Sequence, residues 1–135
     1  LDTYQQSTNS GHVKRLSTPR SALKGIEDLL VGIVADDDSE RALGCMGVGS
    51  VSEFGATDPE LNARRRAAST ALGRRIAERI SEGQQSGELN AALDPNDTAA
   101  FIQMTMTGLQ VAARGGAKAA DLKAMARFAT ERLKA

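Results

Sequence analysis

Three prolines give the clearest constraint on the fold, because each directly follows a residue that favours the start of a helix. The pairs are Thr18-Pro19, Asp58-Pro59 and Asp94-Pro95. Thr and Asp side chains accept hydrogen bonds from the free N–H groups of a first helical turn. Proline is tolerated in that turn because its missing N–H would have no partner within the helix. The pattern predicts three helices that begin near these prolines.

The rest of the sequence also favours helices. Ala and Leu dominate, and the chain has no alternating runs of Val, Ile and Thr of the kind that strands need. We therefore predict an all-α fold, a bundle of about five to six helices. Apolar residues at a spacing of three to four place helices near 19–34, 40–54, 58–85, 96–114 and 119–133. Residues 1–6 fit a helix too, but the stretch 7–11 has poor helix propensity.

Charge and composition exclude several classes of protein. With 17 Lys+Arg against 17 Asp+Glu, the formal net charge is zero, which argues against a stand-alone nucleic-acid binder. One Cys and one His exclude a disulfide framework and a Cys/His zinc site. No apolar run is long enough to span a membrane, and the first residues lack the features of a signal peptide. We expect a cytoplasmic protein with no metal, no other cofactor and no membrane partner.

No motif predicts an enzyme. His12 lies in a polar stretch without a nearby nucleophile or acid, which favours a solvated histidine on a loop or helix face. Cys45 lies among small and apolar residues, as a buried inert thiol does. The segment 44–50 lacks the third glycine of a dinucleotide fingerprint and the Gly-Lys-Ser/Thr of a phosphate loop. The run 64–66 of three arginines shares its helix with acidic residues, which predicts a mixed, solvated face.

The last two predicted helices, 96–114 and 119–133, carry more apolar surface than a small monomer can cover. In the first of them, apolar residues occupy nearly every face, and such a helix must be covered on more than one side. Packing as a four-helix bundle could bury one such face of each helix, not two, so we predict a homodimer through these helices. The expected interface residues are Gly108, Leu109, Ala112, Leu122, Met125, Phe128, Ala129 and Arg132.

A series of short motifs carries a resemblance to a known family. In chain order they are Arg41-Ala42-Leu43-Gly44-Cys45-Met46, Ser52-Glu53-Phe54, Asp58-Pro59-Glu60-Leu61, Glu82-Gly83-Gln84, Gly87-Glu88-Leu89, Leu93-Asp94-Pro95, Thr107-Gly108-Leu109-Gln110-Val111 and Ala113-Arg114-Gly115-Gly116-Ala117. Over about residues 41–133, their order and spacing resemble the C-terminal, effector-binding half of tetracycline-repressor (TetR) family regulators. The start of the chain, Leu1-Asp2-Thr3-Tyr4, is similar to the helix that links the DNA-binding head of these regulators to the body.

This resemblance implies a division of the chain and a function. Residues 1–16 would be a remnant of the linker helix to a helix-turn-helix head that this sequence lacks. Residues 17–135 would be the ligand-binding and dimerisation domain. A small hydrophobic effector would control operator binding, and operator DNA would be contacted only through the missing head. The family has no catalytic residues, which agrees with the absence of an enzyme motif.

Helix faces give the candidate pocket residues. They are mostly apolar, with one or two hydroxyl groups, and comprise Leu23, Ile26, Leu30, Met46, Ser50, Phe54, Leu72, Ile76, Met104 and Thr105. Such a lining suits a small hydrophobic ligand better than a sugar or a polyanion. The alternative is a ligand-free dimerisation and protein-interaction module, in which the same helices close into a dry core and a protein partner provides regulation.

Overall fold

The computed structural model describes residues 2–34 and 58–135, which form helices and no strand. The described helices are α1 (Asp2–Ser17), α2 (Ala22–Ile33), α4 (Pro59–Gln85), α5 (Pro95–Arg114) and α6 (Ala119–Glu131). The predicted all-α class is therefore confirmed. The helix expected over 40–54, with the candidate pocket residues Met46, Ser50 and Phe54, lies outside the described residues, as does Cys45.

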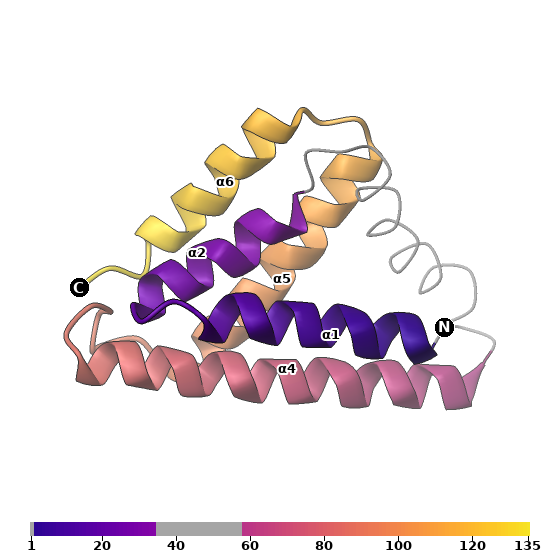
Figure 1. Cartoon of the computed structure of the whole chain (residues 1–135), viewed down its shortest axis with the longest axis horizontal. Coiled ribbons are helices and arrows are strands. Elements are labelled where there is room, and N and C mark those ends of the chain that lie inside the picture. The colour runs from indigo at the N-terminus through magenta and orange to yellow at the C-terminus, as the bar shows by residue number, and fades with distance from the viewer. Residues whose placement is uncertain (1, 35–57) are drawn as a thin grey trace.

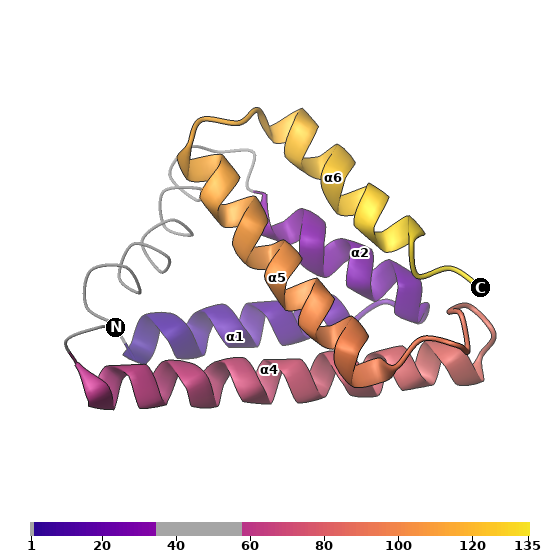
Figure 2. The same ribbon diagram turned by 180° about the vertical axis from the view of Figure 1, so that it is seen from behind.

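Helix α2 is the centre of the arrangement, since it contacts each of the other described helices. Helices α1 and α4 lie side by side and run in the same direction, and α5 crosses from α4 towards the turn that leads into α6 (Figures 1 and 2). Ile26, Leu29 and Leu30 of α2 have no exposed surface and form the middle of the hydrophobic core. Burial of such side chains is the main favourable contribution to folding.

Two of the three predicted helix starts are confirmed. The Asp58 carboxylate accepts a hydrogen bond from the backbone N–H of Leu61 at 3.0 Å, and Asp94 accepts one from Asp97 at 2.8 Å. In both helices proline occupies the first turn. These starts need only residues that are neighbours in sequence, which is why the sequence pattern predicts them correctly.

The third predicted start, at Pro19, is wrong. Helix α2 begins at Ala22, and its N-cap is Ser21, whose hydroxyl accepts a hydrogen bond from the N–H of Lys24 at 3.1 Å. The carbonyl of Pro19 accepts a hydrogen bond from the Arg79 guanidinium instead. A tertiary contact thus holds Pro19 in the connection between α1 and α2.

Helix α1 continues through the stretch 7–11 that its composition disfavours. Tertiary packing overrides the weak propensity. The side-chain amide of Asn9 donates a hydrogen bond to the carbonyl of Ala68 at 3.1 Å, and Leu16 is completely buried against the core. His12 lies between them on the same face and is 7% exposed, so the prediction of a solvated histidine is wrong.

The C-terminus is tied to the connection between α4 and α5. The N–H of Asn90 donates a hydrogen bond to the carbonyl of Leu133 at 3.0 Å, and that of Ala135 donates one to Glu88 at 3.1 Å. Leu89 and Leu133 are buried. The contact fixes the end of α6 beside the start of α2, because the Glu88 carboxylate also accepts a hydrogen bond from the N–H of Ala22 at 2.9 Å.

Candidate functional site

The outward side of α5 and α6 carries exposed apolar side chains. Among the described residues, the large hydrophobic side chains that remain exposed are Phe101 (41%), Met104 (76%), Val111 (52%), Met125 (55%) and Phe128 (53%). All five belong to these two helices. Apolar surface gathered in one region of a small chain marks an interaction site, whereas scattered single residues do not.

These side chains form one stripe on each helix. Phe101, Met104 and Val111 follow one another with Gly108 at intervals of three and four residues, which places them on the same side of α5. A Cβ added to Gly108 would have no heavy atom within 4 Å, so the backbone of α5 is accessible there. We call Phe101, Met104, Gly108, Val111, Met125 and Phe128 the outer apolar face.

A cation borders the outer apolar face on α6. The guanidinium carbon of Arg132 lies 4.1 Å from the centre of the Phe128 ring, within the range of a cation–π interaction. Arg132 thus holds Phe128 in place at the edge of the face. The sequence analysis assigned both residues to the interface, and the structure brings them together.

The predicted interface set divides into two groups. Gly108, Met125 and Phe128 lie on the outer apolar face and Arg132 borders it, while Ala112 is half-buried. Leu109, Leu122 and Ala129 are only 5%, 4% and 6% exposed, because they point inward and pack in the core of the protomer. Their assignment to a surface was wrong. Phe101 and Val111 are exposed on the outer apolar face but were absent from the predicted set.

Met104 needs a further correction. It was expected to line an internal pocket, yet it is the most exposed of the large hydrophobic side chains, on the outer apolar face. Helix α5 is apolar on nearly every side, so the sequence pattern did not distinguish its inner from its outer side. Ile102, Met106 and Leu109 face inward instead.

Four other candidate pocket residues do come together. Ile26 and Leu30 of α2 and Leu72 and Ile76 of α4 are 0–6% exposed and belong to one hydrophobic cluster. Leu23 is half-buried against this cluster. The hydroxyl of Thr105 donates a hydrogen bond to the carbonyl of Phe101 at 2.8 Å, a local bond within α5.

Two polar side chains of the interior were not recognised in the sequence. All three guanidinium nitrogens of Arg65 are buried, and none has a hydrogen-bond partner among the described residues. The same holds for Nδ1 of His12. Burial, and to a smaller extent the nearby charge of Arg15, lowers the pKa of His12 to about 4. For Arg65, the sequence did contain a signal of its inward position. It lies four residues after Leu61 and three before Ala68, on the apolar stripe of α4.

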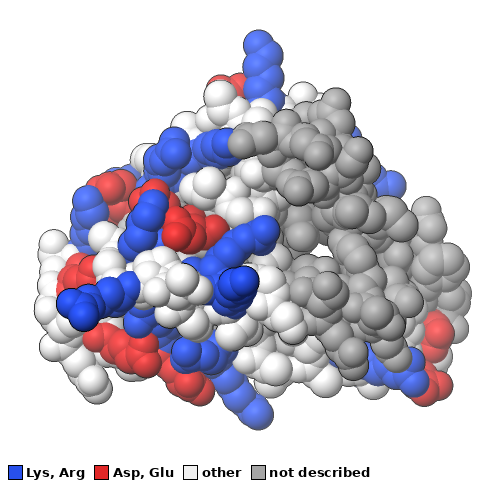
Figure 3. Space-filling view, viewed as in Figure 1, with Lys and Arg blue, Asp and Glu red and all other residues white. Residues whose placement is uncertain are grey.

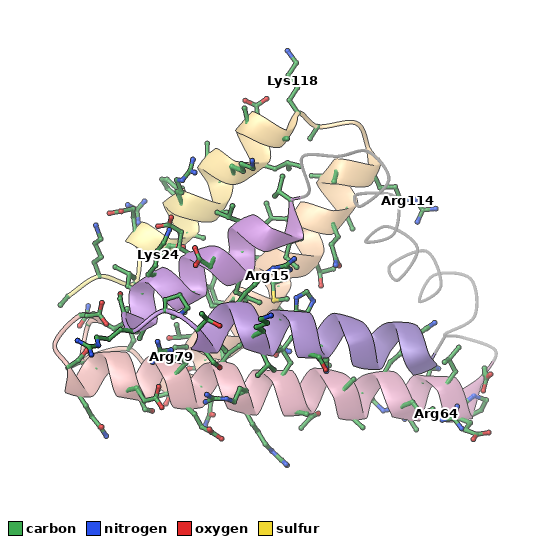
Figure 4. All side chains as sticks on the ribbon, in the orientation of Figure 1. Arg15, Lys24, Arg64, Arg79, Arg114 and Lys118 are labelled. Carbon is green, nitrogen blue, oxygen red and sulfur yellow. The ribbon has the colours of Figure 1, made fainter. Side chains whose placement is uncertain are left out.

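In the same helix, every guanidinium nitrogen of Arg79 has a hydrogen-bond acceptor. Its Nε donates a hydrogen bond to the carbonyl of Leu16 at 3.1 Å, and its other nitrogens bond to the carbonyls of Pro19 and Arg20 and to Glu82. Figure 4 shows Arg79 extending from α4 towards the junction of α1 and α2. Arg79 therefore has a structural role, in contrast to Arg65.

The charged side chains of the described residues are mixed in sign across the surface shown in Figure 3. Many are paired along one helix, as Lys24 is with Asp28 at 3.1 Å. In the described ranges, no group of three or more His, Cys, Asp or Glu could hold a metal ion. None of the helices described is long and apolar enough to cross a membrane.

The fold and the outer apolar face define a class of protein, a helical domain with an exposed apolar surface on its last two helices. Residues 22–129 match the family described as tetracyclin repressor-like, C-terminal domain. The chain belongs to this family, which indicates a TetR-family regulator and confirms the resemblance drawn from the motifs. No curated protein matches the chain.

Proposed function

We propose that this chain is the effector-sensing and dimerisation domain of a TetR-family transcriptional regulator. It acts in the cytoplasm as a homodimer. A small effector with a mainly apolar body controls operator binding by a helix-turn-helix head outside these residues, and the chain itself is not an enzyme.

The outer apolar face is the observation that carries this proposal. Exposed Met and Phe side chains gain free energy when a second copy removes them from water, at roughly 25 cal/mol per Å² of apolar surface. The open backbone at Gly108 allows a helix of the second copy to approach closely. Helices α5 and α6 of two protomers would form a four-helix interface about a two-fold axis.

Dimerisation connects this domain to DNA recognition. Two recognition helices read successive major grooves only when their spacing is about one turn of DNA. The domain can adopt conformations that hold the two DNA-binding heads at different spacings. An effector that binds one of these conformations better than the other shifts the population of the operator-binding state. The size of the shift is limited by the difference between its affinities for the two states.

One observation favours the second candidate, a ligand-free dimerisation module. Ile26, Leu30, Leu72 and Ile76, which were expected to line a pocket, pack in the hydrophobic core. The two functions differ in a thermal-shift screen of small apolar and amphipathic compounds. A sensor is stabilised by at least one of them, whereas a dry module is stabilised by none.

Sedimentation equilibrium tests the dimer. At micromolar concentration the chain should sediment with twice its mass of 14.2 kDa. Phe128→Glu should shift it towards the monomer, because the carboxylate would have to be buried in an apolar interface. Ala71→Glu, on an exposed position of α4, is the control and should leave the dimer intact. A monomeric parent chain would contradict the proposed interface.

A further inference from the structure

Arg65 presents a buried positive charge without a partner. Its three guanidinium nitrogens are buried and donate no hydrogen bond to any of the described residues. A buried charge is strongly unfavourable unless an opposite charge and hydrogen bonds compensate for it. The position is on the inner side of α4, in series with Leu61, Ala68 and Leu72. A buried polar group without a partner is rare in a native structure and calls for an explanation, of which a bound ligand is one.

The carboxylates of α4 do not compensate for Arg65. Glu60 pairs with Arg64 at 2.6 Å. Glu78 and Glu82 pair with other arginines, more than three helical turns further along α4. The described acidic residues of this helix are thus paired with other arginines, and none of them compensates for the charge of Arg65.

His12 supplies a second unpaired polar group on the neighbouring helix. The contact between Asn9 and Ala68 fixes the alignment of the parallel helices α1 and α4. His12 follows Asn9 by three residues, and Arg65 precedes Ala68 by three. At a rise of 1.5 Å per residue, the two positions are about 9 Å apart along the helix axes. One small molecule that lies along the two helices can span this offset and contact both groups.

We propose that the effector is an amphipathic carboxylate whose single anionic group binds the guanidinium of Arg65, while His12 forms a hydrogen bond with another polar atom of the ligand. This inference rests on the proposed sensing function and adds the chemical class of the effector. Arginine matches a carboxylate because its planar fork donates two parallel hydrogen bonds. The half-buried Leu61 and Ala68, about one turn before and after Arg65 on the same side of α4, suit an apolar ligand body.

The number of charges favours a monoanion. Because the pKa of His12 is lowered to about 4, its imidazole is neutral at pH 7 and contributes hydrogen bonding without charge. Arg65 then contributes one positive charge. A ligand with two or more negative charges would leave at least one of them buried without compensation.

The test compares carboxylates with their uncharged amides on the 135-residue chain. Benzoate, 2-naphthoate and octanoate are each added at about 1 mM, beside the amide of the same acid, and thermal unfolding is followed. We expect at least one carboxylate to raise the midpoint by about 3 °C and its amide to raise it clearly less. Arg65→Gln should abolish this preference. Arg66→Gln, the exposed neighbour on the same helix, should retain it.

The outcomes separate this inference from the sensing function. If a carboxylate and its amide stabilise the parent chain equally, the domain binds small molecules but the role of Arg65 is refuted. If Arg65→Gln keeps the preference, it is refuted as well. If no compound stabilises the chain, both the carboxylate inference and the sensing function fail, and the dimer is judged separately by sedimentation.

A second measurement covers the case in which Arg65→Gln does not fold. The Nε–H group of Arg65 gives its own cross-peak in a ¹H–¹⁵N spectrum of the parent chain. A carboxylate should shift this peak and its amide should not. A peak that stays in place while the compound binds elsewhere would overturn the inference.

Discussion

The carbonyl oxygen of Leu16 accepts a hydrogen bond from Nε of Arg79 at 3.1 Å, across 63 residues of sequence. This bond joins the end of α1 to the C-terminal half of α4. The same guanidinium also bonds to the carbonyls of Pro19 and Arg20, so one side chain satisfies the backbone of the connection that leads into α2. This one side chain thus links α1, the connection into α2, and α4.

Arg79→Met should therefore destabilise the domain by about 2–3 kcal/mol, because it leaves partly buried carbonyl groups without donors. Urea unfolding monitored by circular dichroism measures the loss. Arg74→Met, which removes an exposed arginine of the same helix, is the control and should change stability by less than about 0.5 kcal/mol. Equal effects of the two substitutions would show that the bonds of Arg79 contribute little.

Gly25 permits the close approach of α1 and α2. A Cβ at this position would lie 2.2 Å from the carbonyl oxygen of Leu16, a backbone atom that cannot move alone. Gly25→Ala should cost about 3 kcal/mol of stability, measured by urea unfolding. Gly11→Ala is a matched control within α1, where an added Cβ meets nothing within 4 Å. It should stabilise the chain by about 0.5–1 kcal/mol through helix propensity.

Met104 and Leu122 provide a contrast between outer face and core. Met104 is 76% exposed and Leu122 is 4% exposed. Leu122→Ala should lower the free energy of unfolding by about 2–5 kcal/mol because it removes buried atoms and leaves a cavity. Met104→Ala should leave the stability of the protomer nearly unchanged and increase the dissociation constant of the dimer. Sedimentation equilibrium at several concentrations, together with urea unfolding, distinguishes the two effects.

The buried His12 should make stability depend on pH. Its pKa is about 4 in the folded chain against 6.5 for an ordinary histidine. Above pH 6.5 both states are neutral at this residue and its contribution is constant. As the pH falls from 6.5 to 4, the unfolded state binds the proton more tightly, so stability falls by up to about 1.4 kcal/mol per pH unit. Below pH 4 the loss no longer grows.

The His12→Phe variant isolates this contribution. Carboxylates titrate in the same range, but they are common to both chains and cancel in the difference between parent and variant. We expect the difference in unfolding free energy to change between pH 6.5 and 4 in the direction given above. A constant difference over this range would contradict a buried neutral imidazole.

The sequence by itself determined the class of fold, the starts of α4 and α5, and the family. Each depends on local features. Asp58 and Asp94 cap helices through residues only three positions away, apolar spacing identifies a helix, and ordered motifs identify a family.

Only the tertiary structure decided which side of an apolar helix faces inward. On α5, Met104 and Met106 are the same residue type two positions apart, yet one is 76% exposed and the other 6%. Sequence composition cannot separate them, because burial depends on which neighbour covers each side. Likewise Pro19 lies before α2 because the Arg79 guanidinium bonds to its carbonyl. The guanidinium nitrogens of Arg65 are buried although its neighbours Arg64 and Arg66 are exposed. These outcomes depend on contacts between residues about 60 positions apart or on different helices, which local patterns do not encode.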